Sequence, residues 1–202
     1  MKKINIGCGG TPLKNYINID QDNLSSLKKR YPFKEFPKNV IIKNYNIFKL
    51  PFADSSIDEV RADGLIEHLS FIEEPKFFYE IKRVLKPKGK ICLITVDFEK
   101  TVKQWLKAKD EWKNFFKNSK KAISETHWFG TYSYNFKNKW GYLTASIYGS
   151  QNGRGQFHKN CYSEKKLKSI CKKLNFKVDY IKKKRWKKDR DYTLVLRASK
   201  IS

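Results

Sequence analysis

The first twenty residues constrain the fold of this chain more than any other stretch. A short apolar strand around Ile4 and Ile6 runs into Gly7 and Gly9, and a second short strand ends at Asp20. Glycines let a ligand approach the backbone closely, and an acidic residue after the second strand of an open α/β sheet can bind both hydroxyls of a ribose. The stretch therefore predicts a nucleoside-binding site.

The spacing within this stretch limits which nucleosides fit. A dinucleotide fingerprint, G-x-G-x-x-G, counted from Gly7 needs its third glycine at the position of Pro12, and its acidic residue follows about 20 residues on. Asp20 lies only 13 residues after Gly7, which leaves no room for a full helix aimed at a pyrophosphate. No P-loop string, G-x-x-x-x-G-K-[ST], occurs either. We therefore expect a nucleoside without phosphates.

The order of apolar segments predicts the fold class. Residues 73–85 carry apolar side chains at helical spacing, and residues 90–96 form the nearly continuous apolar run that is typical of a strand buried on both faces. We predict an α/β, Rossmann-like, doubly wound and mostly parallel sheet of about seven strands with helices on both faces. Further helices are expected at 21–30, at 99–116 and after the N-cap Ser163, and further strands at 40–42, 57–63, 176–181 and 192–198, the last two joined by a basic turn at 182–191.

Charge is distributed unevenly along the chain, whose formal net charge is +24. Residues 1–100 hold 18 Lys and Arg against 13 Asp and Glu, or +5, whereas residues 101–202 hold 26 against 7, or +19. Such a field attracts anionic partners, which include nucleic acid, phosphorylated small molecules and acidic membrane surfaces. An AT-rich genome would also raise the lysine content, but codon bias alone does not explain the imbalance between the halves.

Cysteine and histidine patterns point to no metal and no disulfide framework. The four cysteines include no C-x-x-C pair, and the three histidines show no ligand spacing with carboxylates or cysteines. No apolar run approaches the length of a membrane span. We therefore expect a protein of the reducing cytoplasm, and the sequence indicates no oligomeric state.

Five short segments follow one another along the first hundred residues. They are Asn5–Gly9 (NIGCG), Asn18–Asp20 (NID), Leu50–Val60 (LPF, then SIDEV), Glu67–Leu69 (EHL) and Arg83–Lys90 (RVLKPKGK). In this order they resemble the motifs of class I S-adenosylmethionine-dependent methyltransferases. The resemblance implies S-adenosyl-L-methionine as cofactor, a sulfonium with an adenosine but no phosphate, which agrees with the spacing argument.

The resemblance also implies positions for the cofactor. Asp20 would bind the ribose hydroxyls, and Asn46 stands where the family usually has an Asp beside the adenine amino group. An Asn oxygen can accept the same hydrogen bond, although a neutral acceptor is weaker. The methionine part would lie beside the end of the strand at 57–63. The expected cofactor-binding residues are Asn5, Gly7, Cys8, Gly9, Asp20, Asn46, Ile47, Asp63, Gly64, Leu65 and His68.

A single domain is expected, with a cofactor-binding half at 1–98, an acceptor-side insertion at 99–162 and a closing helix and strand pair at 163–202. Residues 117–153 are the least regular and are expected to help form the acceptor pocket.

The acceptor is indicated by a looser resemblance. Residues 147–151, 156–159 and 162–163 resemble the closing part of small bacterial methyltransferases that modify sugars and cell-surface glycans. This implies O-methylation of a sugar, glycan or other small anionic acceptor, including phosphorylated ones. His158 is the candidate general base, because the ordinary pKa of histidine suits proton transfer near neutral pH, and His68 and His127 compete for that role.

Two other functions remain open from the sequence. An RNA methyltransferase could use the basic second half, with bases stacked on aromatic side chains such as Trp128, Tyr132, Tyr134 or Trp140. A catalytically silent domain would keep the fold as a binding module. No Asn/Asp-Pro-Pro-Tyr/Phe follows the strand at 57–63 and no Pro-Cys dipeptide occurs, which disfavours methylation of base amines by that route and C5 methylation.

Overall fold

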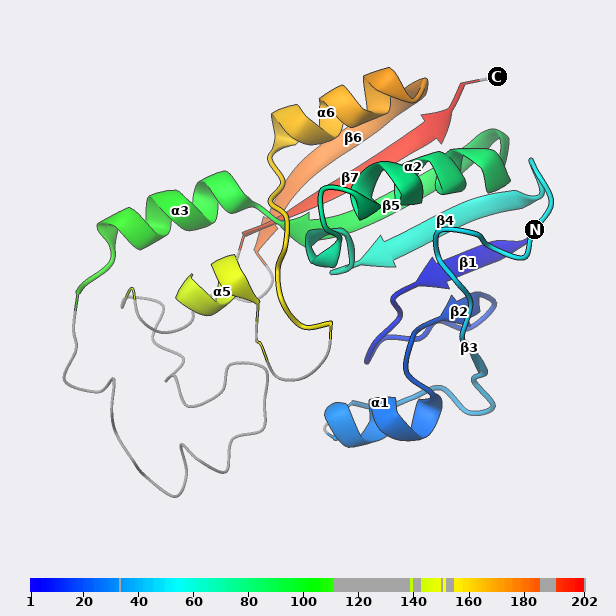
Figure 1. Ribbon diagram of the computed structural model, residues 1–202, viewed down its shortest axis with the longest axis horizontal. Helices are drawn as coiled ribbons and strands as arrows, with labels where there is room; N and C mark the ends of the chain where they lie inside the picture. Colours follow the sequence, from blue (N-terminus) through cyan, green and yellow to red (C-terminus); the bar gives the residue numbers. More distant parts are fainter. Residues whose placement is uncertain are drawn as a thin grey trace.

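The computed structural model describes residues 1–32, 34–110, 139, 143–149, 151, 155–185 and 192–201. These residues form a seven-stranded sheet in the order β3-β2-β1-β4-β5-β7-β6, in which β7 runs antiparallel to the other six strands (Figure 1). The strands are β1 (Lys3–Ile6), β2 (Ile17–Ile19), β3 (Ile42–Lys43), β4 (Ile57–Asp63), β5 (Leu85–Val96), β6 (Phe176–Arg185) and β7 (Tyr192–Lys200). The predicted Rossmann-like fold is confirmed.

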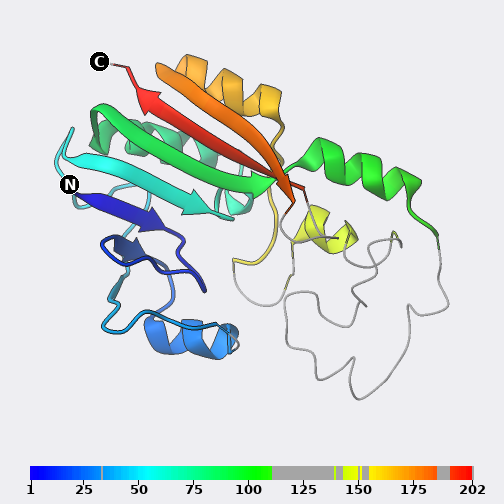
Figure 2. The same cartoon turned by 180° about the vertical axis from the view of Figure 1, so that it is seen from behind.

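The described helices are α1 (Leu24–Arg30), the 3-10 turn η1 (Ile66–His68), α2 (Glu73–Val84), α3 (Phe98–Lys107), α5 (Thr144–Tyr148) and α6 (Glu164–Lys173). Figures 1 and 2 show α2 and α6 on the same face of the sheet, while α1 lies at the edge formed by β2 and β3. On the face toward α2, Ile4, Val60 and Leu93 are fully buried and join the side chains of Phe77 and Ile81 in one core. Alternation along the strands places this apolar set on one side of the sheet.

The opposite face of the central strands carries several charged side chains. Figure 2 draws no helix over its centre, so the helices expected on both faces lie over one face only among the described residues. Register sets Glu59 and Arg61 of β4 beside residues of β1 and β5 on this face. The Tyr16 hydroxyl donates to Glu59 Oε1 at 2.6 Å, and the guanidinium of Arg197 lies 3.6 Å from Glu59 Oε2. Burial and the bond to Glu59 raise the pKa of Tyr16 to about 12. Polar pairing therefore takes the place of an apolar core on this side.

Several element boundaries differ from those expected from the sequence. The strand expected at 90–96 begins at Leu85, directly after α2, because Leu85 already pairs with Ile57 of β4. The pairing is irregular between Leu85 and Lys90, where Lys88 has a φ of 62°. β6 continues through residues expected to be a turn, because its pairing with β7 extends to Arg185. The helix expected at 99–116 is described as α3 up to Lys107, and its residues from 111 on lie outside the described part. The short α5 lies within a segment that we expected to be irregular.

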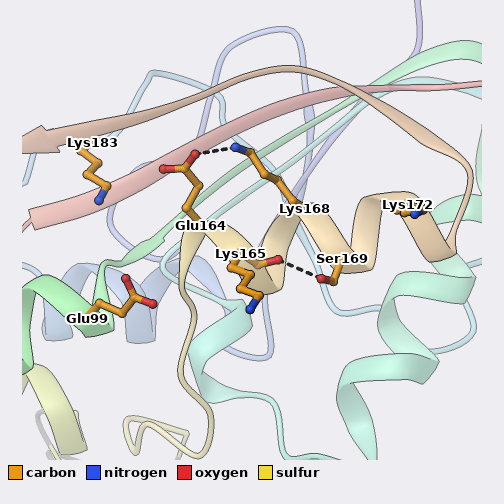
Figure 3. A pocket seen from close by; sticks show the side chains of 7 residues that line it. All are labelled: Glu99, Glu164, Lys165, Lys168, Ser169, Lys172 and Lys183. Carbon is orange, nitrogen blue, oxygen red and sulfur yellow. Dashed lines mark hydrogen bonds and ion pairs between the residues drawn. The ribbon is translucent and has the colours of Figure 1, made fainter.

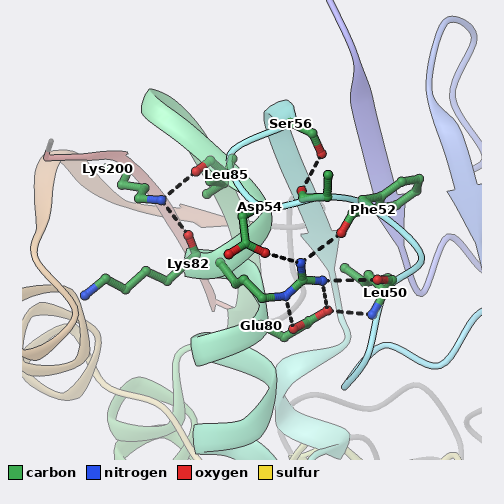
Figure 4. Close-up of polar contacts among 10 residues, drawn as sticks. Leu50, Phe52, Asp54, Ser56, Glu80, Lys82, Leu85 and Lys200 are labelled. Atoms are coloured by element: carbon green, nitrogen blue, oxygen red, sulfur yellow. Dashed lines mark hydrogen bonds and ion pairs between the residues drawn. The ribbon is translucent and has the colours of Figure 1, made fainter.

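Two of the resembling motifs are joined by one polar network (Figure 4). The Arg83 guanidinium donates to the backbone oxygens of Leu50 and Phe52 and to the carboxylates of Glu80 and Asp54. Glu80 in turn accepts from the backbone nitrogen of Leu50. The hydrogen bonds from Arg83 hold the pKa of Glu80 below its ordinary value. The LPF loop and α2 are thereby fixed to one another through charge-assisted bonds.

Candidate cofactor and acceptor site

The glycine loop after β1 is held against the end of β2. Gly7 and Cys8 both donate backbone hydrogen bonds to the oxygen of Ile19, at 2.8 and 3.2 Å. Gly7 and Gly9 have φ values of 63° and 48°, a region that L-residues with a side chain rarely adopt. A Cβ on Gly7 would stand 2.9 Å from Cδ1 of Leu65. The first glycine is therefore required both by backbone conformation and by the close approach of the loop after β4.

Asp20 turns its carboxylate back onto this loop. Its Oδ2 accepts from the backbone nitrogen of Gly9 at 2.8 Å, and its Oδ1 accepts from that of Asp22 at 3.0 Å. A carboxylate oxygen has two lone-pair directions, so each oxygen can still accept a hydroxyl hydrogen. The arrangement fits the diol of a ribose while it stabilises the turn.

Asn5 and Cys8 support the loop from inside. The Asn5 side chain is 2% exposed and donates to the Asn18 side chain at 3.0 Å and to the Thr11 backbone at 3.3 Å. Burial raises the pKa of the Cys8 thiol to about 12, so the group stays a neutral thiol at physiological pH. The side chains of both expected cofactor-binding residues therefore shape the loop from within the protein.

Asn46 lies in the loop between β3 and β4. Its Oδ1 accepts from the backbone nitrogen of Phe48 at 2.9 Å, which closes a local Asx turn. Ile47 packs partly buried against the core. The Asn46 side-chain oxygen, which we expected beside the adenine amino group, thus already accepts one hydrogen bond. One lone pair of this oxygen remains for a ligand.

Asp63 is the last residue of β4, and Gly64 and Leu65 follow it. Two nitrogens of Arg61 bind Oδ2 of Asp63, at 2.9 and 2.6 Å. Burial raises the pKa of Asp63, and the bonds from Arg61 oppose this rise. Among the described residues, Oδ1 of Asp63 is buried without a hydrogen-bond partner. An orphaned buried oxygen beside Gly64 is suited to accept from the ammonium of an amino-acid ligand, so the residues fit the expected cofactor.

Tyr31 is a site residue that sequence reasoning missed. Its ring covers the outer side of the glycine loop, since a Cβ on Gly10 would stand 2.9 Å from Tyr31 Cγ and one on Gly9 would stand 3.4 Å from the hydroxyl oxygen. Burial raises the pKa of this phenol. The only signal in the sequence was its position directly after the helix expected at 21–30.

His68 and His158 meet although they lie far apart in the chain. Their ring centroids are 4.8 Å apart with an interplanar angle of 71°. His68 Nδ1 lies 2.9 Å from the backbone oxygen of Phe157, and His158 Nδ1 lies 2.9 Å from that of Ser146. Burial lowers the pKa of His158, although the nearby Glu67 carboxylate opposes this shift, so the neutral ring is favoured. A neutral ring bonded through Nδ1–H keeps a lone pair on Nε2.

The segment that carries His158 is bonded through its backbone to η1, the turn after β4. Lys159 and Asn160 donate their backbone nitrogens to the oxygen of Glu67 at 2.9 and 3.1 Å. The backbone nitrogen of His158 donates to the oxygen of Tyr148, the last residue of α5. His68 and His158, both named from the sequence, are therefore brought to one place, together with the unexpected Glu67. The competing His127 and the aromatic residues Trp128, Tyr132, Tyr134 and Trp140 lie outside the described residues.

A basic hollow of about 450 Å³ opens beside α6 (Figure 3). Lys168 forms an ion pair with Glu164 at 2.7 Å, and Lys183 lies 3.8 Å from the buried carboxylate of Asp97. The residues that line the hollow are Glu99, Glu164, Lys165, Lys168, Ser169, Lys172 and Lys183. Lysines outnumber the acidic residues, so the hollow would favour an anionic group.

The sheet order and the hydrogen bond between the glycine loop and an acidic residue are those of a Rossmann-like domain. Residues 5–93, which are 89 of the 202 residues, match the family described as a methyltransferase domain. This match agrees with the predicted resemblance to class I S-adenosylmethionine-dependent methyltransferases and with S-adenosyl-L-methionine as the cofactor.

Curated relatives match about half of the chain. An uncharacterised protein of Methanocaldococcus jannaschii is 30% identical over 105 residues, which are 50% of this chain and 43% of that protein. An uncharacterised protein of Haemophilus influenzae is 26% identical over 117 residues, or 51% and 47% of the two chains. The matched part is thus less than half the length of either relative.

Solved structures share the fold across the chain. A Methanosarcina mazei S-adenosylmethionine-dependent methyltransferase is similar with a TM-score of 0.60 at 17% identity, covering 99% of this chain and 92% of the other. A Burkholderia thailandensis 1,6-didemethyltoxoflavin N1-methyltransferase, solved with that compound and S-adenosylhomocysteine bound, has a TM-score of 0.58 at 11% identity, covering 100% and 71%. Within the described residues, no helix is both long and apolar enough to cross a membrane.

Proposed function

We propose that this protein transfers a methyl group from S-adenosylmethionine to an oxygen atom of a sugar, a glycan or another small anionic acceptor. The observation that carries the proposal is the position of His158. Its ring packs on His68, and its segment is bonded to Glu67, just beyond the loop whose Leu65 contacts Gly7. These contacts support a position for the candidate base on the same side as the candidate cofactor loop. We further propose that residues 1–98 bind the cofactor and that residues 99–162 form the acceptor side.

Each part of the cofactor has a proposed partner in the chain. Asp20 would accept from the ribose hydroxyls, and the free lone pair of the Asn46 oxygen would accept from the adenine amino group. The buried Oδ1 of Asp63 would accept from the ammonium of the methionine part. When bound, the cofactor supplies a methyl group on a sulfonium sulfur, which keeps both electrons of the broken C–S bond.

His158 would take the proton of the acceptor hydroxyl. Its Nδ1–H donates to the Ser146 backbone, so Nε2 is the atom that accepts the proton as the acceptor oxygen forms its bond to the methyl carbon. Burial favours the neutral ring that can do this. Because methyl transfer depends mainly on alignment, the base is expected to accelerate the reaction rather than to be indispensable.

The basic hollow supports an anionic acceptor. Lys165, Lys168, Lys172 and Lys183 surround it, at the side of the sheet where α3 leaves β5 through Asp97 (Figure 3). Their combined charge would raise the local concentration of a phosphorylated or carboxylated sugar. An acceptor without charge would not use this feature.

The test is transfer of a radiolabelled methyl group from S-adenosylmethionine to three separate acceptor pools: nucleotide sugars and oligosaccharides, purified anionic polysaccharide, and total RNA. We expect label in one of the carbohydrate pools, released as the methyl ether on hydrolysis. Calorimetry with S-adenosylmethionine is run in parallel. Cofactor binding with no transfer to any pool would indicate a catalytically silent module, and label in RNA alone would contradict the proposed acceptor.

The same lysines favour RNA as a second candidate. Binding to phosphates releases counterions, so affinity for mixed RNA should then fall steeply between 50 and 200 mM salt, by about 10³-fold or more for six phosphate contacts. Affinity that hardly responds to salt would count against RNA.

A further inference from the structure

Glu67, His68 and His158 form a cluster of metal-ligand side chains. Each offers one ligand atom, and these atoms lie within 4.8 Å of one another. Glu67 and His68 come from η1, directly after β4, whereas His158 comes from the loop that precedes α6. The sequence predicted no metal site, because the histidine that completes the cluster lies 90 residues from the other one.

Both imidazoles are oriented for coordination. A backbone carbonyl can only accept, so the 2.9 Å contacts to Phe157 and Ser146 require a hydrogen on Nδ1 of each ring. In the neutral tautomer this leaves Nε2 with its lone pair. Histidine ligands of metals commonly donate their second ring N–H to a carbonyl or a carboxylate, which sets the tautomer and the ring direction.

The carboxylate of Glu67 is also held in place. Its residue is 4% exposed, and Thr95 Oγ1 donates to Oε2 at 3.0 Å. The Glu67 backbone oxygen accepts from Lys159 and Asn160, which braces the loop that carries His158. A buried carboxylate with one hydrogen bond to a hydroxyl retains lone pairs for a cation.

We propose that Glu67, His68 and His158 bind a divalent transition metal of the Zn²⁺ or Fe²⁺ class. Two imidazoles and one carboxylate suit these ions, whereas Mg²⁺ and Ca²⁺ prefer oxygen ligands. Metal–ligand bonds of about 2.0–2.2 Å bring tetrahedral ligand atoms to about 3.4 Å from one another, so binding closes the cluster by roughly 1 Å. Three protein ligands leave an open position for water or for an acceptor oxygen.

The cluster lies where such a metal can meet the acceptor. Oε1 of Glu67 is 3.8 Å from the point where a Cβ on Gly64 would stand, at the end of β4. A metal there would coordinate the acceptor hydroxyl and lower its pKa, which makes the oxygen a better nucleophile without a side-chain base. The inference that the metal activates the acceptor hydroxyl rests on the proposed function, whereas the inference that the cluster binds a metal does not. The two roles of His158 exclude each other, since Nε2 is either a ligand or a base.

The test is titration of the chelator-treated protein with Co²⁺, followed by its visible absorption, and then displacement by Zn²⁺. We expect one Co²⁺ per chain, micromolar or tighter affinity, and displacement by Zn²⁺. Glu67→Gln, His68→Gln and His158→Gln should each weaken binding at least tenfold. Glu67→Gln retains an oxygen for Thr95, and circular dichroism establishes that each variant is folded.

Two control variants separate this site from adventitious binding. Cys161→Ser removes an exposed thiol, and His127→Gln removes the remaining histidine. Both should bind Co²⁺ as the wild type does. Absence of binding at 100 µM Co²⁺, or binding that persists in all three cluster variants, would overturn the proposal.

Calorimetry with S-adenosylmethionine distinguishes the two proposals. A protein that binds metal but not the cofactor would contradict the proposed function alone. A protein that transfers methyl groups after chelation, and loses rate in His158→Gln, would show His158 acting as a base and contradict the metal role.

Discussion

The His158 ring lies edge-on to the His68 ring, with centroids 4.8 Å apart, and each ring donates its Nδ1–H to a backbone carbonyl. This contact joins the loop after β4 to the loop before α6, the two segments that we propose lie on the cofactor side and on the acceptor side. Hydrogen bonds to the backbone fix the orientation of both rings, and Nε2 of each ring keeps a lone pair that can accept a proton or bind a metal ion. Ser146, in the middle of α5, supplies one of these carbonyls, so the short helix has a positioning role.

Replacement of Asp20 by Ala should weaken S-adenosylmethionine binding about 10- to 100-fold, because hydrogen bonds to a charged group contribute about 1.5–3 kcal/mol. Calorimetry measures the change. Asp58→Asn is the matched control. Asp58 lies at the beginning of β4, away from the glycine loop, and its carboxylate accepts a hydrogen bond from Lys86. Equal affinity in wild type and Asp20→Ala would remove Asp20 from the site.

Asp63→Asn should change the melting temperature and the affinity for S-adenosylmethionine in different ways. The variant keeps an oxygen for Arg61 but removes the charge from a carboxylate whose Oδ1 is buried without a partner among the described residues. Burying an unpaired charged oxygen is costly, so the melting temperature of the free protein should stay the same or rise. Affinity for S-adenosylmethionine should fall at least about fivefold, because the ammonium loses a charged acceptor. A melting temperature that falls while affinity is unchanged would contradict this role.

Gly7→Ala should destabilise the protein by about 2–4 kcal/mol, measured by urea unfolding. A left-handed backbone costs an L-residue about 1–2 kcal/mol, and the new Cβ would also meet Leu65 Cδ1 at 2.9 Å. Gly64→Ala is the matched control, because Gly64 has a similar φ of 64° but its new Cβ would stand 3.8 Å from Glu67 Oε1, an ordinary contact distance. The double variant Gly7→Ala with Leu65→Ala should recover part of the loss. Equal costs at Gly7 and Gly64 would show that the contact with Leu65 is unimportant.

Glu80→Gln should lower stability by about 1–2 kcal/mol at pH 7, because Arg83 loses its charged partner while the Leu50 nitrogen keeps an acceptor. The folded-state pKa of Glu80 is lowered, so its contribution is present above its ordinary value, near 4.5, and is lost as the pH falls through the lowered pKa. The difference between wild type and variant should therefore shrink below pH 4.5. Glu164→Gln is the control, because it removes an exposed ion pair with Lys168. This variant should change the free energy of unfolding by less than about 0.5 kcal/mol. A pH-independent difference for Glu80→Gln would contradict the assigned cause.

Most of the sheet could be predicted from the sequence, because burial of one or both faces leaves a periodic apolar pattern in each strand. The boundaries that differ are those set by pairing between strands. β6 extends to Arg185 because β7 pairs with it, although its residues 182–185 are polar and read as a turn. The LPF and RVL motifs, seen only as a resemblance, have a physical basis in the bonds of Arg83 to Leu50 and Phe52.

By itself the sequence determined the glycine loop, the acidic residue at the end of the second strand and the resemblance to a methyltransferase family, because these depend on residues close together in the chain. Only the tertiary structure decided that Tyr31 covers Gly9 and Gly10, that Asn5 lies inside the loop, and that Glu67 and His68 meet His158. The physical reason is that the crossover connections of a parallel sheet bring the ends of distant strands to one edge. Local spacing carries no information about which loops meet there.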